Sequence, residues 1–456
     1  MKNSTKKVSS KKSPSCLSPI NQKVAGIDIG ANSVFVCISL KGKWEVREYP
    51  TFTADLKAMA KWLKTHKITG VAMESTGVYW IPVYDILEKS GFEVLLVNAH
   101  HVKNVPGRKT DVKDCQWIQQ LHSYGLLRAS FRPTQEILPL RAFVRLRSRL
   151  FESASVQIQL MHKALTQMNI KLRPVLNDIT GETGMKIIKS IVAGERDPKK
   201  LASYRNYRCK KSEDEIAKAL EGNFLKEHLF ALKQSLNAYE FFQSQILECE
   251  QNIEETLKSL HKENKSESIE RVKKNFSKSK KKTASNRSPY YFEAAISVEK
   301  AIGVNLLEIP GMDAPTIIKI LSEIGTDMTR WPTVKHFTSW LALCPGNKIS
   351  GGKVLSSRTK PTNNKAAQAL RIAANSLYKS QSALGAFFRR MRARLGAPKA
   401  ITAAAHKIAK ILYIMLRDKK SFQEIGEHYY ENRYKKRVLS SLIKKAEAFG
   451  YHLVEN

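Results

Sequence analysis

Acidic side chains are scarce in this sequence. The chain has 41 Asp and Glu against 77 Lys and Arg over 456 residues, which leaves a formal net charge of +36. A polyanion is the natural partner of such a chain, so we expect nucleic acid, with a membrane surface or the ribosome as alternatives. Charge alone says nothing about fold or chemistry, but the length allows two or three domains, each with its own core.

Cysteine is also scarce, and its positions are scattered. The sequence has no CxxC pair and no cluster of His and Cys at zinc-ligand spacing. This excludes the common zinc modules, and we expect reduced, mostly buried thiols in a cytosolic protein. The six cysteines are Cys16, Cys37, Cys115, Cys209, Cys249 and Cys344.

Long apolar runs are absent too. Residues 1–23 are basic and rich in Ser and Pro but have no apolar segment, and no uncharged run approaches the ~20 residues that a membrane span needs. The phosphate-binding patterns GxxxxGKS and GxxxxGKT are missing as well, so we expect no ATP-driven step. We therefore predict a cytoplasmic protein without a membrane partner.

What is present begins with a segment rich in strands. From Val24 the sequence "VAGIDIGANSVFVCISLKGKWEVREYP" alternates short β-branched runs with turn residues, which predicts two or three antiparallel strands. Further strands at 70–76 and 92–98 then alternate with helices around 56–63, at 79–88 and from 111 to about 127. This order predicts a mixed α/β sheet that is covered on both faces, and no strands are predicted beyond about residue 138.

Two long amphipathic stretches follow, near 138–170 and near 225–260. In the second, apolar residues recur at alternating spacings of four and three, and only Gln243 and Glu250 interrupt the seam. This predicts a coiled coil, within the chain or between chains, with a helix packed only on its own domain as the alternative. The seam residues are Leu225, Leu229, Leu232, Leu236, Tyr239, Ile246, Ile253, Leu257 and Leu260.

The remainder divides into a linker, a helical domain and a tail. Residues 262–290 are rich in Lys and Ser with hardly any apolar content, which predicts a flexible basic linker. A helical domain is predicted from about 298 to 418, followed by a charged tail with room for one more helix. Within the domain, an apolar-Pro-Gly turn at 306–325 fits either a phosphate-gripping helix start or an ordinary packing corner.

Four carboxylates occupy unusual positions. Asp28 lies inside the first strand, in "GIDIG", and Glu74 ends the strand "VAMES", where charged side chains disfavour a sheet unless something offsets them. Asp111 and Asp114 are three residues apart, so they share one helix face. Like charges gather only when cations balance them, and hard oxygen ligands select Mg²⁺ or Mn²⁺. Two such ions, about 3.5–4 Å apart, would clamp the oxygens of a phosphodiester. By itself "DVKD" would favour an N-cap Asp111 and a surface Asp114, and only the four carboxylates together favour a metal site.

The order of a strand Asp, a strand Glu and a helical Asp-x-x-Asp on a five-stranded mixed sheet resembles the RuvC-like branch of the RNase H fold. The motifs "GIDIG", "MESTGVYW" and "GRKTDVKDCQW" narrow the likeness to the DEDD transposases of the IS110 insertion-sequence family. The likeness continues through "GETGMKIIKSIVAGERDP" and into the C-terminal domain. It implies an RNA-guided DNA recombinase of the bacterial cytoplasm and nucleoid, in which a structured bridge RNA pairs with donor and target DNA.

The resemblance also implies a domain order. It begins with a RuvC-like α/β catalytic domain, continues with a helical coiled-coil middle and ends with a mainly α C-terminal transposase domain. The expected divisions are a disordered basic N-terminus at 1–22, the RuvC-like domain at 23–135, the coiled-coil region at 136–261, the linker at 262–295, the transposase domain at 296–420 and a tail at 421–456. A homo-oligomer, either a dimer or a tetramer, is expected through the coiled coil.

A nucleophile is implied as well. The family has a serine in a Ser-Gly loop of the C-terminal domain, and Ser350 in "NKISGGK" is the matching position, with Ser356 and Ser357 as competitors. Alone, Ser-Gly-Gly indicates only a turn, since a serine hydroxyl is a poor nucleophile without help from a metal or a base. The match implies a covalent 5′-phosphoserine intermediate, which would conserve the phosphodiester energy.

Basic residues near both sets of candidates are expected to bind nucleic acid, although a solvated basic face explains any single one equally well. They are Arg108, Lys109, Lys348, Lys353, Arg358 and Lys360, with His100 and His101 as weaker candidates. Two other functions also fit the sequence. A metal-dependent nuclease or junction resolvase of the same fold would hydrolyse DNA with activated water, and a non-catalytic nucleic-acid-binding protein would retain the carboxylates without using them.

Overall fold

The computed structural model describes residues 18–40, 42–75, 77–98, 110–263 and 290–454. The chain divides into two compact units, residues 1–132 and residues 133–456. Most of the predicted linker, most of the predicted disordered N-terminus, and His100, His101, Arg108 and Lys109 lie outside the described residues.

The first unit is built on a five-stranded mixed sheet, as predicted. Its strand order is β3-β2-β1-β4-β5, in which β1, β2 and β3 are antiparallel neighbours and β4 and β5 run parallel to β1. This order fits an RNase H-like fold. The strands are β1 (Val24–Ile29), β2 (Ser33–Leu40), β3 (Lys43–Pro50), β4 (Gly70–Glu74) and β5 (Glu93–Val97).

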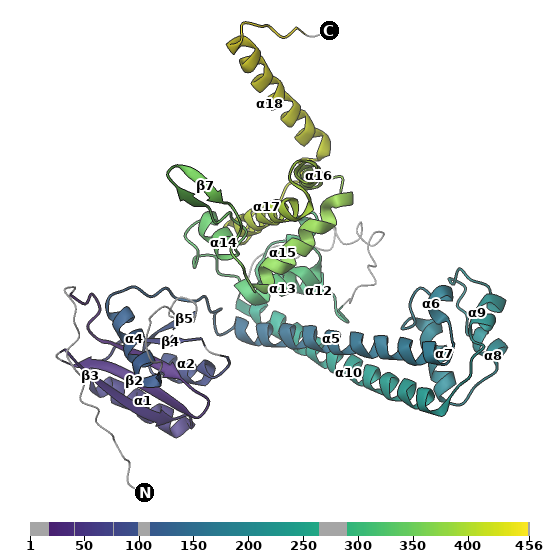
Figure 1. Cartoon of the computed structure of the whole chain (residues 1–456), viewed down its shortest axis with the longest axis horizontal. Coiled ribbons are helices and arrows are strands. Elements are labelled where there is room, and N and C mark those ends of the chain that lie inside the picture. The colour runs from purple at the N-terminus through teal and green to yellow at the C-terminus, as the bar shows by residue number, and fades with distance from the viewer. Residues whose placement is uncertain (1–17, 41, 76, 99–109, 264–289, 455–456) are drawn as a thin grey trace. The chain divides into compact units, whose positions relative to one another are not determined.

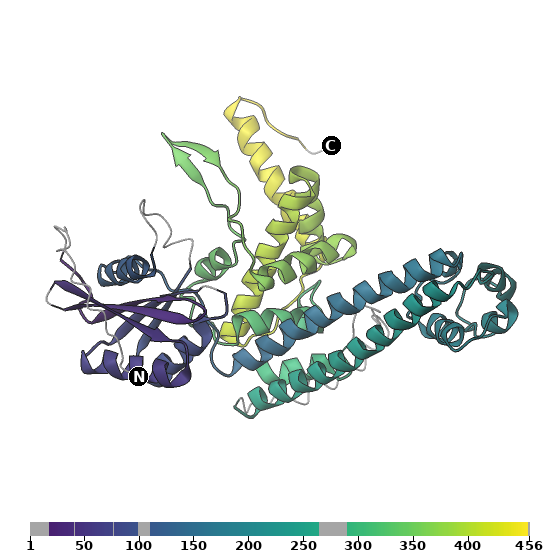
Figure 2. The ribbon, with the colours of Figure 1, turned by 60° about the horizontal axis from the view of Figure 1, so that its bottom comes forward.

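Helices cover both faces of this sheet, also as predicted. Figure 2 shows α1 (Thr53–Thr65) and α2 (Trp80–Lys89) on one face and α4 (Asp111–Ser123) on the other. The main core lies under α1 and α2, where alternate strand residues meet buried side chains of both helices. The helix expected to continue to about 127 ends at Ser123, because Gly125 adopts a left-handed φ of +67° that terminates it.

The second unit contains a long helical hairpin. Helices α5 (Ile137–Gln167) and α10 (Lys226–Glu263) lie side by side along their length (Figure 1). The predicted seam of α10 faces α5 and a small helical cluster of the same chain. Of the seam residues, Leu225 is exposed, Leu229 and Tyr239 are partly buried, and the buried ones are Leu232, Leu236, Ile246, Ile253, Leu257 and Leu260.

Four short helices that the sequence analysis did not resolve join the two arms of the hairpin. They form a cluster with its own core, into which Met161 and Leu165 of α5 and Leu232 and Leu236 of α10 are packed. They are α6 (Leu172–Val175), α7 (Glu182–Val192), α8 (Pro198–Ala202) and α9 (Glu213–Ala219).

The C-terminal part is mainly helical, as expected, but it also contains a β-hairpin that the sequence analysis did not predict. The two strands are β6 (Lys348–Ser350) and β7 (Lys353–Ser356). The helices are α12 (Ala294–Ile302), α13 (Ala314–Ile324), α14 (Val334–Trp340), α15 (Lys365–Ser376), α16 (Ala383–Leu395), α17 (Ala397–Asp418) and α18 (Glu427–Ala448).

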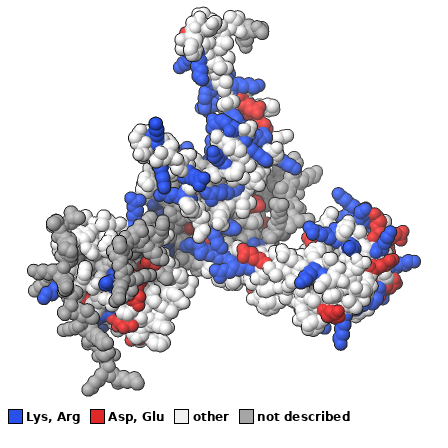
Figure 3. Space-filling model, in the orientation of Figure 1, with Lys and Arg blue, Asp and Glu red and all other residues white. Residues whose placement is uncertain are grey.

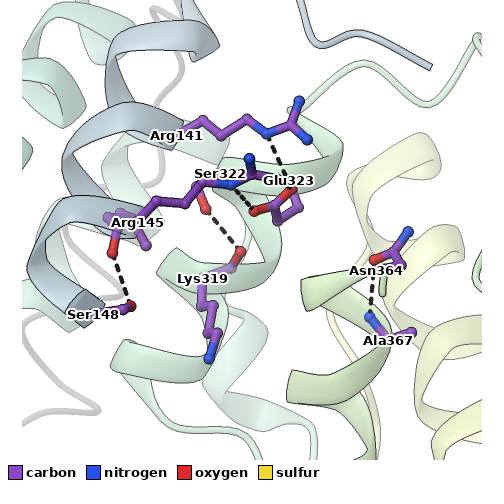
Figure 4. A network of polar contacts seen from close by, with 9 residues as sticks. Arg141, Arg145, Ser148, Lys319, Ser322, Glu323, Asn364 and Ala367 are labelled. Atoms are coloured by element: carbon purple, nitrogen blue, oxygen red, sulfur yellow. Dashed lines mark hydrogen bonds and ion pairs between the residues drawn. The ribbon is translucent and has the colours of Figure 1, made fainter. Parts of the chain in front are cut away.

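Ion pairs with the buried carboxylates of Glu323 and Glu250 fasten these helices to the long hairpin. On α5, Arg141 and Arg145 lie 3.1 and 2.8 Å from the carboxylate of Glu323 on α13 (Figure 4). Nearby, Arg147 of α5 donates to Glu250 of α10 at 2.7 Å, and Glu250 also accepts from the backbone N–H of Tyr291 at 2.8 Å. Breaking one partner of such a buried pair is strongly destabilising, so the helical hairpin and the C-terminal helices behave as parts of one unit.

Two further expectations can be compared with the structure. No helix in the described ranges is long and apolar enough to cross a membrane. The cysteines of the described residues are free thiols, with Cys37, Cys115 and Cys249 buried and Cys209 and Cys344 partly buried.

Candidate active site

Strand β1 presents Asp28 on the face of the sheet that α4 covers. Side chains of a strand alternate between faces, and Ala25, Ile27 and Ile29 belong to the core under α1 and α2. Gly26 and Asp28 therefore point to the opposite face, toward α4. Asp28 is only partly buried.

Gly26 allows helix α4 to lie directly on the strand. A Cβ atom at this position would come within 2.2 Å of the backbone nitrogen of Gln119 and 2.4 Å of the carbonyl oxygen of Cys115. No other residue has room there, so glycine fixes where the helix crosses β1. Gly26 stands in "VAGIDIG" two residues before Asp28, and a glycine inside a strand was the one sequence signal that could have revealed this contact.

The acidic pair lies at the start of the same helix. Asp111 is the first residue of α4 and precedes Cys115 by one helical turn, which places Asp111 and Asp114 toward the Asp28 end of the contact with β1. The N-cap is Thr110, whose hydroxyl accepts from the backbone N–H of Lys113 at 3.3 Å, so the alternative of Asp111 as the cap is wrong. Carboxylates in the first turn are stabilised by the positive end of the helix dipole.

Glu74 reaches this face from the neighbouring strand. It is the last residue of β4 and shares a face with Ala72, which packs against Ile118 of α4. The parallel register pairs Ile27 with Met73. Asp28 and Glu74 are the next residues of these two strands, so they lie at the same level on adjacent strands.

The electrostatics of Asp28 reflect its burial and the charges of the three other carboxylates. Burial raises the pKa of Asp28 most, and the negative charges of Asp114, Asp111 and Glu74 raise it further, to about 6 from its ordinary value of 3.8. A hydrogen bond from the Ile29 backbone opposes this shift only in part. Among the described residues, however, no three His, Cys, Asp or Glu side chains are gathered closely enough to hold one metal ion.

Two thiols lie behind the carboxylates. Cys37 pairs with Gly26 in the β1–β2 register, and Cys115 belongs to the turn of α4 that rests on Gly26. A hydrogen bond with Cys37, burial and the nearby charge of Asp28 raise the pKa of the Cys115 thiol far above its usual range. Cys115 therefore stays protonated at neutral pH and serves packing.

Ser350 lies at the tip of the β6–β7 hairpin, in the second unit. It pairs with Lys353 across a two-residue turn in which Gly351 and Gly352 have φ of +53° and +75°, a conformation that favours glycine. The stem of the hairpin is closed by a hydrogen bond from the Gly346 backbone N–H to the Arg358 carbonyl oxygen at 2.9 Å. The Ser350 side chain is exposed and faces solvent from a defined turn.

The surroundings of Ser350 are basic and unexpectedly apolar. Lys348, Lys353, Arg358 and Lys360 are all exposed on or beside the hairpin. Ile349, Val354 and Leu355 are exposed as well, by 61, 59 and 69%. Of the competing serines, Ser357 is exposed, whereas the Ser356 hydroxyl is partly buried and accepts from the Arg358 backbone N–H at 3.4 Å.

The turn before α13 favours the packing alternative over phosphate binding. Asp313 caps the helix, and its carboxylate accepts from the Thr316 backbone N–H at 2.9 Å. A negative side chain at this position opposes a bound phosphate. Gly311 lets the turn approach the Ala373 carbonyl oxygen, to which an added Cβ atom would come within 2.7 Å.

Two family models match the parts of the chain that carry these residues. A model described as a transposase, of the IS110 DEDD type, matches residues 25–170, which include all four carboxylates. A second model, of transposases of the IS116/IS110/IS902 family, matches residues 304–389, which include Ser350. The chain belongs to the IS110 family of DEDD transposases. No curated protein matches it.

Membership of the IS110 family makes the chain a transposase that acts on DNA. DEDD transposases usually use a divalent metal ion, in agreement with the oxygen ligands that the four carboxylates offer. Residues 171–303 and 390–456, which include the small helical cluster, α17 and α18, lie outside both matched ranges.

Proposed function

We propose that this IS110 transposase cuts and rejoins DNA strands with two groups of residues. Asp28, Glu74, Asp111 and Asp114 hold divalent metal, and Ser350 attacks the DNA phosphate. The observation that carries the proposal is the placement of Asp28 and Glu74 at the same level on adjacent strands, on the sheet face covered by the helix that begins with Asp111 and Asp114. The raised pKa of Asp28, caused first by burial and then by these charges, agrees with it. Carboxylates near one another disfavour each other's charged form, and such an arrangement is typical of sites that bind a cation.

The carboxylates suit Mg²⁺ or Mn²⁺ by their chemistry. They offer only oxygen donors, and a cation would remove the mutual repulsion that keeps their side chains apart. Asp111 is exposed and Asp114 and Glu74 are partly buried, so their side chains have room to turn toward an ion. When bound, the metal supplies Lewis-acid activation of a phosphoryl oxygen and stabilises the charge that develops there.

The serine step balances without an external energy source. The Ser350 oxygen bonds to the phosphorus, the bond from phosphorus to the 3′ oxygen breaks, and the proton lost by serine is matched by the one that the departing 3′ hydroxyl gains. A 3′ hydroxyl from another strand then displaces serine from the 5′-phosphoserine, which restores both the phosphodiester and Ser350. The exposed position of Ser350 on a two-residue turn supports this role, because a nucleophile must reach its phosphate.

RNA guidance is part of the proposal and rests on the family resemblance. A bridge RNA that pairs with donor and target DNA would bring many phosphate groups to one protein. The net charge of +36 would balance part of their negative charge. Assembly into a dimer or tetramer belongs to the same proposal. The rival is a nuclease or resolvase that uses the same carboxylates to hydrolyse DNA with water.

The deciding experiment traps the protein on a suicide DNA substrate with its RNA and Mg²⁺, followed by denaturing gels and mass spectrometry. We expect a covalent adduct on the peptide that contains Ser350, and we expect it to disappear in Ser350→Ala, in Asp114→Asn and in excess EDTA. The matched controls are Ser357→Ala, on the same exposed segment, and Asp55→Asn, in the first turn of α1 on the other face of the sheet. Both should form the adduct normally.

Each alternative predicts a different result. DNA cleavage without an adduct would return the protein to the hydrolytic nuclease. An adduct on Ser356 or Ser357 would move the nucleophile. Normal cleavage in EDTA would remove the metal from the proposal, and unchanged transposition in Asp28→Ala would favour the non-catalytic alternative.

A further inference from the structure

The last three helices that the structure describes bring together basic side chains beyond residue 389, where the second matched family range ends. Helix α18 has no buried residue, and it is held to the unit at its first turns. There Arg389 of α16 pairs with Glu427 at 2.5 Å, and Arg390 donates to the hydroxyl of Tyr430. The contact gathers cations from α16, α17 and α18 around shared aromatic rings.

Aromatic rings of α16 and α18 lie beside the cations of this contact. The Arg390 guanidinium lies 3.8 Å from the ring centre of Tyr434 and 4.8 Å from that of Tyr430. The ammonium of Lys407 on α17 lies 4.0 Å from the ring of Phe387 and 5.5 Å from the ring of Tyr430. Tyr430 thus has cations from two different helices beside it.

Each of these contacts has a further exposed cation one helical turn away. Arg394 follows Arg390 by one turn on α16, Lys410 follows Lys407 by one turn on α17, and Arg437 follows Tyr434 by one turn on α18. We name these residues the C-terminal cation cluster, and its members are Arg390, Arg394, Lys407, Lys410 and Arg437. Figure 3 shows Lys and Arg gathered over the C-terminal helices.

The C-terminal cation cluster has little negative charge beside it. In the part of the chain that the structure describes, none of its members forms an ion pair with a carboxylate. The acidic neighbour that favours the charged form of Arg390 is the exposed Glu431. Burial lowers the pKa of Lys407, and the positive charges of Arg390, Lys410 and Arg437 lower it further. Cations held this close repel one another, and a bound polyanion would relieve that repulsion.

A hollow of about 690 Å³ extends the basic surface along the other side of α17. It lies between α14 and α17, and Lys410 belongs both to its lining and to the cluster. Lys335, His406 and Arg417 contribute the remaining basic groups of the lining. The basic groups of the cluster and the hollow therefore come from four helices, α14, α16, α17 and α18.

We infer that the C-terminal cation cluster binds the phosphate backbone of duplex DNA, through residues other than those of the Ser350 hairpin. The inference rests on the proposed function for the identity of the polyanion. A duplex fits better than a mononucleotide, because α18 has 22 residues and is therefore about 33 Å long, close to one turn of B-DNA. Arg433, Lys435, Lys436, Lys444 and Lys445 add exposed cations along it.

The test compares two variants that lose the same charge. One is Arg394→Gln with Lys410→Gln and Arg437→Gln, which removes three exposed members of the cluster. The control is Lys199→Gln with Lys218→Gln and Lys233→Gln, which removes three exposed lysines from the helical cluster and α10. The single variant Arg437→Gln guards against misfolding, because α18 buries no side chain. Thermal unfolding confirms that all variants are folded.

Binding is measured by fluorescence anisotropy of a labelled DNA duplex in EDTA, over a range of salt concentrations. Each lost phosphate contact lowers the slope of log affinity against log salt by about 0.9, so we expect a decrease of up to about 2.7 in the triple variant and about 0.9 in Arg437→Gln. The control should keep the wild-type slope. A triple variant with the slope of the control would overturn the inference.

A second arm uses an RNA duplex of the same sequence. A slope that decreases for RNA and stays unchanged for DNA would overturn the assignment to DNA. Anisotropy measures DNA binding and not strand cleavage, so this result is independent of the proposed chemistry. Loss of the Ser350 adduct with normal DNA binding, or the reverse, shows which of the two proposals has failed.

Discussion

At the scale of single residues, Asp28 is the most informative side chain. Its carboxyl has a pKa of about 6 because it is partly buried and faces Asp114, Asp111 and Glu74. In the absence of metal, the folded state therefore holds this proton more tightly than the unfolded state does. The stability of the metal-free fold should depend on pH for this reason.

The first prediction follows from the sign of that shift. The stabilising contribution of the Asp28 proton is fully present below pH 3.8 and is lost as the pH rises through about 6. The shift corresponds to about 3 kcal/mol, which solvent screening of a partly exposed group reduces to about 1–2 kcal/mol. In EDTA, Asp28→Asn should exceed the wild type in free energy of unfolding by this amount at pH 7.5.

Urea denaturation between pH 4 and pH 7.5 measures the difference. It should shrink strongly toward pH 4, where Asp28 is neutral in the folded state and about half neutral in the unfolded state. Added Mg²⁺ should stabilise the wild type more than Asp28→Asn, because bound cations stabilise the native state by mass action. A difference that does not vary with pH would show that Asp28 has an ordinary pKa.

At the scale of elements, the position of α4 on β1 brings the acidic pair to the strand carboxylates. Only the absence of a side chain at Gly26 permits the contact with Cys115 and Gln119. The helix thereby carries Asp111 and Asp114 to the same end of the sheet as Asp28 and Glu74. The position of the candidate site thus depends on Gly26, which has no side chain that could bind metal or react.

The second prediction concerns this contact. Gly26→Ala should push α4 away from the sheet, destabilise the first unit by about 1–3 kcal/mol as overpacking does, and weaken Mn²⁺ binding measured by calorimetry. Gly70→Ala is the matched control on the neighbouring strand, where an added Cβ atom meets side-chain atoms of His122 and Val24, each at 3.3 Å. These side chains have room to adjust, so metal binding should stay near the wild-type value. Equal losses in both variants would contradict the role of Gly26.

At the scale of the whole molecule, the helical hairpin changes the expectation for assembly. The seam of α10 is buried by α5 and the small helical cluster of the same chain, so a contact between chains would need other residues. The exposed apolar residues of the two long helices include Leu146, Val156, Phe230 and Phe241. Association of protomers through the hairpin stays a prediction, and its surface would be this outer face.

The third prediction separates packing within the chain from packing between chains. Leu232→Ala should lower the free energy of unfolding by about 2–5 kcal/mol, because it leaves a cavity in a closed core. The melting temperature should fall by the same amount at all protein concentrations, and the mass in light scattering should not change. Leu247→Ala is the control, since Leu247 lies on the same helix and is 42% exposed. A melting temperature that falls more at low concentration would show that the seam joins protomers.

The sequence alone determined the order of elements in the first unit, both long helices and the family of the chain. Strand alternation, helical periodicity and turn residues are local properties, so they predicted the five-stranded sheet, both long helices and the helix that begins at Asp111. The motifs around Asp28, Glu74 and Asp114 pointed to the IS110 family, which the two family models confirm.

Only the tertiary structure decided how those pieces meet. The close approach at Gly26, the repulsion that raises the pKa of Asp28 and the burial of the α10 seam within its own chain depend on contacts between distant segments. The β6–β7 hairpin was missed because its short strands expose Ile349, Val354 and Leu355 and show no alternation of a buried face. The C-terminal cation cluster was missed for a different reason. Its charges come from α16, α17 and α18 and become neighbours only when these helices pack.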